Sequence, residues 1–92
     1  MTPRKTAQPP AYRPRRGAPV RDAATGFVGL FQSVEDNVLR EHRSVARAYI
    51  RPYGGGVEVE TDPAMLREPT PEEILSARVA AENRRSRERL HG

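Results

Sequence analysis

The spacing of apolar residues between positions 27 and 51 constrains this 92-residue chain more than any other feature. Seven positions follow one another at intervals of four, three, four, four, three and four residues: Phe27, Phe31, Val34, Val38, His42, Val45 and Tyr49. At about 100° per residue they fall on one face of a helix, with Leu30 and Ala48 at its margin. The spacing therefore predicts an amphipathic helix over residues 23–51.

Local signals mark both ends of this expected helix. Asp22 suits its N-cap, with Thr25 as the alternative, and the helix must end before Pro52. Gly26 and Gly29 weaken the first turn. They either form a smooth surface that another backbone can approach closely, or belong to a loop that precedes the helix.

A second helix is predicted over residues 70–90. Thr70 can cap it, Pro71 suits the first helical position, and Glu73 can return a hydrogen bond to the amide of Thr70. Ile74 and Leu75 could then cover part of the first helix. The expected fold is mainly α, either a helical hairpin or two loosely coupled helices.

The remaining segments are predicted to be a basic arm and a linker. Residues 1–22 contain five prolines and an excess of basic residues, which predicts a disordered basic arm. Residues 52–69 form a glycine-rich, acidic linker with a hinge at residues 54–56. Residues 57–61 alternate like a strand, and we expect either extended coil or a strand added to the sheet edge of another protein.

Composition limits the chemistry that such a chain can perform. It has no cysteine and only two histidines, so thiolate chemistry is excluded and we expect no metal and no cofactor. With 36% hydrophobic and 5% aromatic residues, it has little material for a water-excluding pocket, and we expect no enzymatic activity. Without a secretory signal or a transmembrane segment, the expected location is the cytoplasm.

The apolar face of the first helix is the candidate binding site. We expect a small helical interaction protein, an adaptor, scaffold or accessory subunit, that docks this face on a partner protein or on a second copy. The candidate partner-binding residues are Phe27, Leu30, Phe31, Val34, Val38, His42, Val45 and Tyr49. His42 is interpreted as an interface residue, because no second histidine lies within one helical turn.

Two alternatives involve an anionic or hydrophobic surface. The helix could coat or anchor to a membrane or a hydrophobic granule, and the basic arm could bind nucleic acid, since the formal net charge is +4. The candidate electrostatic contacts are Arg13, Arg15, Arg16, Arg40, Arg43 and Arg47. They could equally form an ordinary solvated face.

Overall fold

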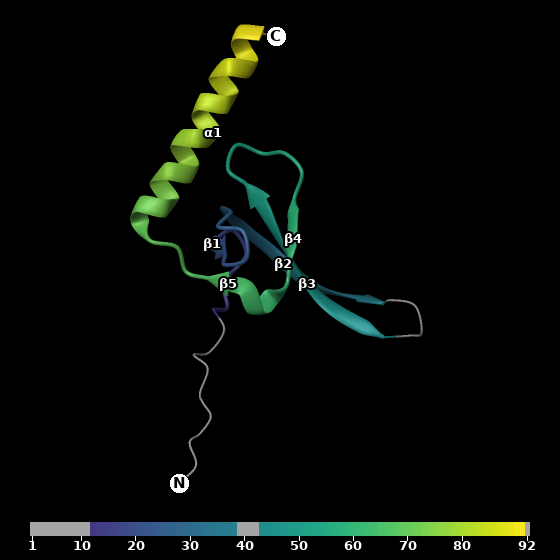
Figure 1. Ribbon diagram of the computed structural model, residues 1–92. Coiled ribbons are helices and arrows are strands. Elements are labelled where there is room, and N and C mark those ends of the chain that lie inside the picture. Colours follow the sequence, from purple (N-terminus) through teal and green to yellow (C-terminus); the bar gives the residue numbers. More distant parts are fainter. Residues whose placement is uncertain (1–11, 39–42, 92) are drawn as a thin grey trace.

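The computed structural model describes residues 12–38 and 43–91, which form an antiparallel sheet followed by a C-terminal helix (Figure 1). The five strands are β1 (Pro19–Asp22), β2 (Val28–Val38), β3 (Ser44–Pro52), β4 (Val59–Thr61) and β5 (Leu66–Arg67). A 3-10 turn, η2 (Pro63–Met65), precedes β5, and the helix α1 spans Pro71–His91. The strands lie in the order β4-β3-β2-β1-β5.

The predicted mainly helical fold is wrong, because the stretch read as the first helix forms the hairpin β2–β3. An interval of four residues is even, so it keeps side chains on one face of a strand as well as of a helix. The interval of three between Phe31 and Val34 comes from a β-bulge. Phe31 pairs with Ile50 and Val34 with Ala48, and the register shifts between them. The extra residue returns Val34 to the face of Phe31 and so imitates the helical period.

Gly29 is needed where β2 and β3 meet. A Cβ atom at this position would lie 2.5 Å from the carbonyl oxygen of Arg51 and 2.8 Å from Cγ2 of Ile50. The glycine does permit close approach of a backbone, as one reading of the sequence suggests, but that backbone belongs to β3 of the same chain. Gly26 lies in the preceding loop at a φ of 83°.

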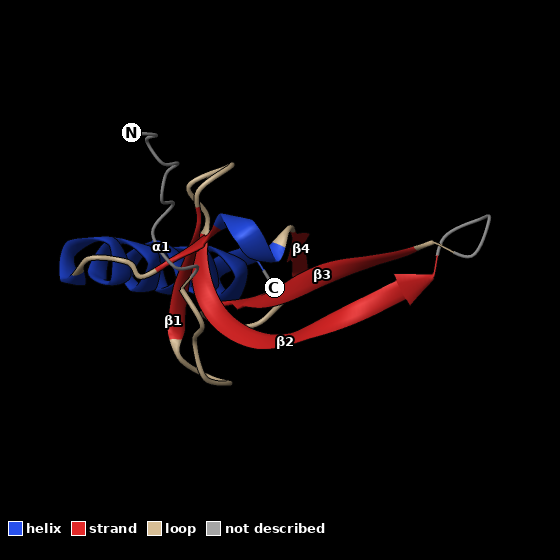
Figure 2. Ribbon diagram, turned by 90° about the horizontal axis from the view of Figure 1, so that it is seen from below, coloured by secondary structure: helices blue, strands red, loops and turns tan. Residues whose placement is uncertain are grey.

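The core lies on one face of the curved sheet, here named the inner face. Figure 2 shows how strongly β2 bends around it. The buried apolar cluster on this face consists of Val20, Phe31, Ala48, Ile50 and Leu66, with the half-buried Tyr12, Phe27 and Val59 packed against it. Each strand of the sheet contributes to this cluster, so pairing and core formation depend on one another.

Asp22 caps a turn and not a helix. Its Oδ1 accepts a hydrogen bond from the amide of Ala24 at 2.9 Å, and its Oδ2 accepts one from the hydroxyl of Thr25 at 3.0 Å. The residue is only 2% exposed. The prediction that Asp22 caps local backbone is confirmed, but the prediction that it caps a helix is wrong. The same side chains stabilise both turns and helix starts.

The predicted disordered arm is ordered where the structure describes it. The amide of Gly17 donates to the carbonyl of Phe31 at 2.7 Å, and residues 19–22 form β1 between β2 and β5. Pro19 is tolerated as the first residue of its strand. Residues 1–11 of the arm lie outside the described residues.

The expected linker also belongs to the sheet. β4 pairs with β3, so that Val59 lies opposite Ile50 and Thr61 opposite Ala48. The stretch with the strand period, residues 57–61, therefore contains a strand that pairs with β3 of the same chain. This pairing cannot be predicted from the local sequence. The side chain of Asp62 then caps η2 by accepting from the amide of Ala64 at 2.9 Å.

The C-terminal helix has the predicted start. The hydroxyl of Thr70 accepts from the amide of Glu73 at 3.1 Å, and the carboxylate of Glu73 accepts from the amide of Thr70 at 2.8 Å. The later turns of α1 extend beyond the sheet (Figure 1). Within the described ranges, no helix combines the length and apolar character needed to cross a membrane.

Candidate functional site

The outer part of the β2–β3 hairpin projects from the rest of the fold, on the side away from α1 (Figures 1 and 2). β1 pairs with β2 only at residues 28–30, and β4 pairs with β3 only at residues 48–50. Residues 33–38 and 44–47, here named the arm and distinct from the basic arm expected at residues 1–22, form a two-stranded ribbon. Its two edges pair with no other strand among the described residues. Two-stranded ribbons are marginally stable in water by themselves.

The inner face of the arm is apolar, and nothing in the described part of the chain covers it. The register places Val34 opposite Ala48, Asp36 opposite Ala46 and Val38 opposite Ser44. Val34 is 48% exposed and Val38 is 72% exposed. Two large apolar side chains thus stand on this face among small neighbours, with one carboxylate between them.

The opposite face of the arm holds a polar network. Nδ2 of Asn37 donates to the hydroxyl of Tyr49 at 3.2 Å, and that hydroxyl donates to Oε2 of Glu60 at 3.5 Å. Nε of Arg47 lies 3.2 Å from the same oxygen. These contacts tie the arm to β4 and engage Asn37 and Arg47 within the chain. The apolar residue of this face, Val45, is 37% exposed, so the inner face with Val34 and Val38 presents the larger exposed apolar surface.

A groove continues the inner face of the arm toward the core. It has a volume of about 540 Å³. Its lining consists of Tyr12, Arg13, Pro14, Phe31, Val34, Pro63, Ala64 and Leu66. This inner groove is apolar apart from the exposed Arg13, and Val34 belongs both to the groove and to the arm.

A second hollow of about 470 Å³ lies between α1 and the sheet. Small helix residues such as Ala77 and Ala80 face Phe27, Val28 and Tyr53 across it. Burial raises the pKa of Tyr53 above its ordinary value, while the guanidinium of Arg78 acts in the opposite direction. The hollow results from the short side chains of this helix face.

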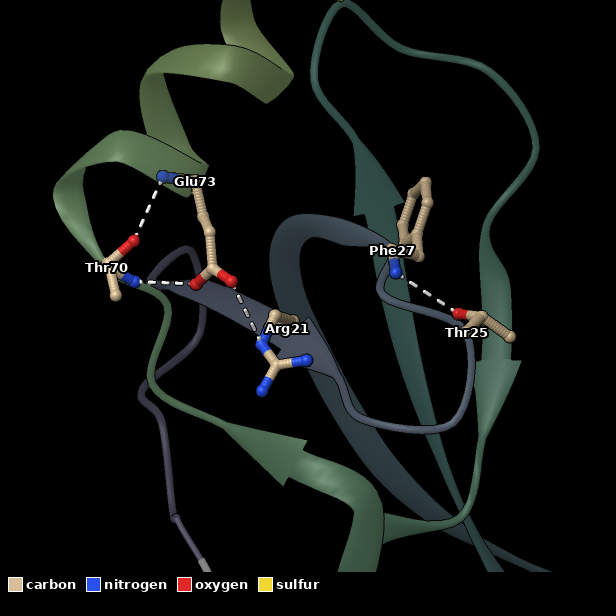
Figure 3. A network of polar contacts seen from close by, with 5 residues as sticks. All are labelled: Arg21, Thr25, Phe27, Thr70 and Glu73. Atoms are coloured by element: carbon tan, nitrogen blue, oxygen red, sulfur yellow. Dashed lines mark hydrogen bonds and ion pairs between the residues drawn. The ribbon is translucent and has the colours of Figure 1, made fainter.

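Glu73, one of two glutamates that line this hollow, is engaged in contacts that stabilise the fold. Figure 3 shows Glu73 reaching Nε of Arg21 on β1, at 3.5 Å, while its other oxygen binds the amide of Thr70. In the same view the amide of Phe27 donates to the hydroxyl of Thr25. Among the described residues, no group of three or more His, Asp or Glu could hold a metal ion.

The eight candidate partner-binding residues do not form one surface. Phe31 is in the core, and Phe27 packs against it. Val34 and Val38 come together on the inner face of the arm, whereas Val45 and Tyr49 lie on the opposite face, as their pairing with Asn37 and Ser33 requires. Leu30 is half-buried on β2, and His42 lies outside the described residues.

The six candidate electrostatic residues are also separated. Arg13, Arg15 and Arg16 are exposed in the segment before β1, and Arg43 is exposed beside the arm. Arg47 is bound to Glu60, and Arg40 lies outside the described residues. The structure thus divides these arginines between two parts of the sheet.

The inner groove was not predicted from the sequence. Pro63 and Leu66 contribute to it from a segment that was expected to be a linker, and Tyr12 from one expected to be disordered. The Asp62–Pro63 pair, which is typical of a short helix start, is the one local signal that could have indicated structure there. No protein-family model, curated protein or solved structure matches this chain.

Proposed function

We propose that this chain is a non-enzymatic interaction protein, an adaptor or accessory subunit, which docks on a protein surface through the inner face of the arm. That surface belongs either to a different protein or to a second copy. The observation that carries the proposal is the exposure of Val34 and Val38, at 48% and 72%, on a two-stranded ribbon that no other described segment covers.

Docking on a partner would give the arm the additional strand or covering layer that it lacks. A ribbon of two strands needs a third strand or a covering layer for independent stability. Fully burying a valine contributes about 1.5–3 kcal/mol, so covering Val34 and Val38 would stabilise both the arm and the complex. Natural proteins usually protect such open edges, which makes an exposed apolar ribbon a feature that points to a partner.

The charges of the arm favour a protein partner over nucleic acid or an anionic membrane. In the described part of the arm and at residue 43, two acids, Glu35 and Asp36, balance two bases, Arg43 and Arg47. Binding to phosphates depends on an excess of cations. On α1, Arg85 and Arg89 both lie near Glu82, at 3.7 and 3.8 Å, which reduces their availability for an anionic surface.

The test is site-specific photo-crosslinking in the cells from which the protein comes. A photoreactive amino acid replaces Val38 in the full chain, and the matched control replaces Val57, which is 89% exposed in the loop before β4. We expect one dominant protein adduct from position 38 and none in common with position 57. The same adducts from both positions, or none from position 38, would contradict the proposal.

A further inference from the structure

We propose that the surface bound by the arm is a second copy of this chain, which rests on the proposed function above. Two copies dock inner face to inner face about a two-fold axis that passes near Val34. The arm of each copy then lies over the inner groove of the other. Such an interface is self-complementary and closes at two subunits.

The arm and the groove lie on opposite sides of Val34 along β2. Val38 lies four residues beyond Val34, which is about 13 Å at 3.3 Å per residue. Phe31, which lines the groove, lies three residues before Val34, but the bulge makes this only two steps of the β3 register, or about 7 Å. A two-fold axis near Val34 reverses the direction along β2. It therefore places the stretch from Asp36 to Val38 of one copy over the groove of the other.

The surfaces have the shapes that face-to-face packing requires. Facing sheets pack about 10 Å apart when side chains of the two inner faces interdigitate. On the arm, Ala46 and Ser44 leave low positions opposite Asp36 and Val38. Opposite them, the groove of about 540 Å³ offers room between Tyr12 and Leu66 for one valine side chain of the second copy.

The charges of the two surfaces are complementary. Asp36 stands between Val34 and Val38 on the inner face, and Arg13 is the one charged residue that lines the groove. Within the described ranges, neither takes part in the ion pairs Arg21–Glu73, Arg47–Glu60, Arg85–Glu82 and Arg89–Glu82. Burying Asp36 without a partner would be costly, and the two-fold arrangement brings Arg13 of the other copy toward it.

The first test measures the mass of the full chain by sedimentation equilibrium over a wide range of concentration. We expect a monomer–dimer equilibrium that Val38→Asp weakens by about tenfold or more, since it places a carboxylate in an apolar groove. Val57→Asp is the control and should leave the equilibrium unchanged. A chain that is monomeric throughout, or a dimer that resists Val38→Asp, would overturn the proposal.

A charge exchange tests the predicted pair of residues. Asp36→Arg and Arg13→Asp should each weaken the dimer, and the double variant should recover most of the lost self-association. Circular dichroism should show that all three variants remain folded, because both side chains lie at the surface of the described structure. A double variant that associates no better than the weaker single variant would contradict the pairing of these residues across the interface.

Cross-linking locates the two-fold axis and separates this inference from the proposed function. The chain has no cysteine, so Val34→Cys introduces a single thiol, and a short bismaleimide should join two copies through it. Val57→Cys should not be joined under the same conditions. A monomeric chain whose position 38 photo-crosslinks to a different protein would overturn the second-copy inference and leave the proposed function standing.

Discussion

Glu73 of α1 and Arg21 of β1 form an ion pair, with 3.5 Å between Oε2 and Nε, that connects the first turn of the helix to the sheet. The same carboxylate accepts a hydrogen bond from the amide of Thr70. One side chain thus both starts the helix and fixes where it lies. A second attachment follows farther along, where Nη2 of Arg84 donates to the carbonyl of Tyr53 at 3.2 Å.

Glu73→Ala is expected to lower the free energy of unfolding by about 1 kcal/mol, because it removes half of the capping box and the ion pair to Arg21. Glu72→Ala, at the exposed neighbouring position, is the matched control and should cost less, since Glu72 has no ion-pair or hydrogen-bond partner among the described residues and acts there through its charge near the helix start. Urea unfolding measures both values. Equal losses for the two variants would show that the specific contacts of Glu73 contribute nothing.

Gly54→Ala should disturb the packing of α1 against the sheet. Gly54 and Gly55 both have positive φ, at 82° and 91°, so alanine is strained by about 1–2 kcal/mol at either position. A Cβ atom at Gly54 would also lie 3.3 Å from that of Ala81, whereas one at Gly55 would have nothing within 4 Å. We expect Gly54→Ala to lower the melting temperature more than Gly55→Ala.

The rate of amide hydrogen exchange in α1 is a second measurement that distinguishes these two variants. Gly54→Ala should increase amide exchange in the turns around Ala81, and Gly55→Ala should not, because only the first substitution presses on the helix. If both variants change the exchange of α1 equally, the contact between Gly54 and Ala81 does not position the helix.

Asp22→Ala is expected to cost about 1–3 kcal/mol of stability, since it removes two hydrogen bonds that the buried carboxylate accepts, from the amide of Ala24 and from the hydroxyl of Thr25. Asp22→Asn should cost less, because its carbonyl oxygen can still accept from the amide of Ala24. Thermal unfolding of both variants measures the difference. A loss in Asp22→Asn as large as in Asp22→Ala would indicate that the negative charge, and not the acceptor geometry, matters.

Tyr53 should ionise above the ordinary tyrosine pKa of about 10, because burial disfavours the phenolate. The unfolded ring releases its proton first as the pH rises. The stability associated with Tyr53 is therefore present below the unfolded pKa and is lost as the pH rises through the folded one. Tyr53→Phe should lose less stability over this alkaline range than the parent protein, as measured by urea unfolding at increasing pH.

Ultraviolet absorption offers the direct measurement of this ionisation. The phenolate signal that is missing from Tyr53→Phe, relative to the parent protein, should develop above the pH at which an exposed tyrosine ionises. A difference spectrum that develops at or below the ordinary tyrosine pKa would contradict the burial of this ring beside α1.

The sequence by itself determined the features whose partners lie close together along the chain. The start of α1 could be predicted because Thr70 and Glu73 are three residues apart, and their reciprocal hydrogen bonds form in any context that lets the helix begin. A capping residue at Asp22 could be recognised for the same reason, although its local hydrogen bonds suit a turn as well as a helix.

Only the tertiary structure decided between helix and strand for residues 28–52. The intervals of four residues fit both periods, and the bulge between Phe31 and Ser33 supplied an interval of three that imitates a helix. The strands are held by distant partners, such as Arg67 opposite Arg21, and the core joins Val20 to Leu66. Because these pairings bury the inner face only when all strands are assembled, no local period could reveal them, and the inner groove remained hidden with them.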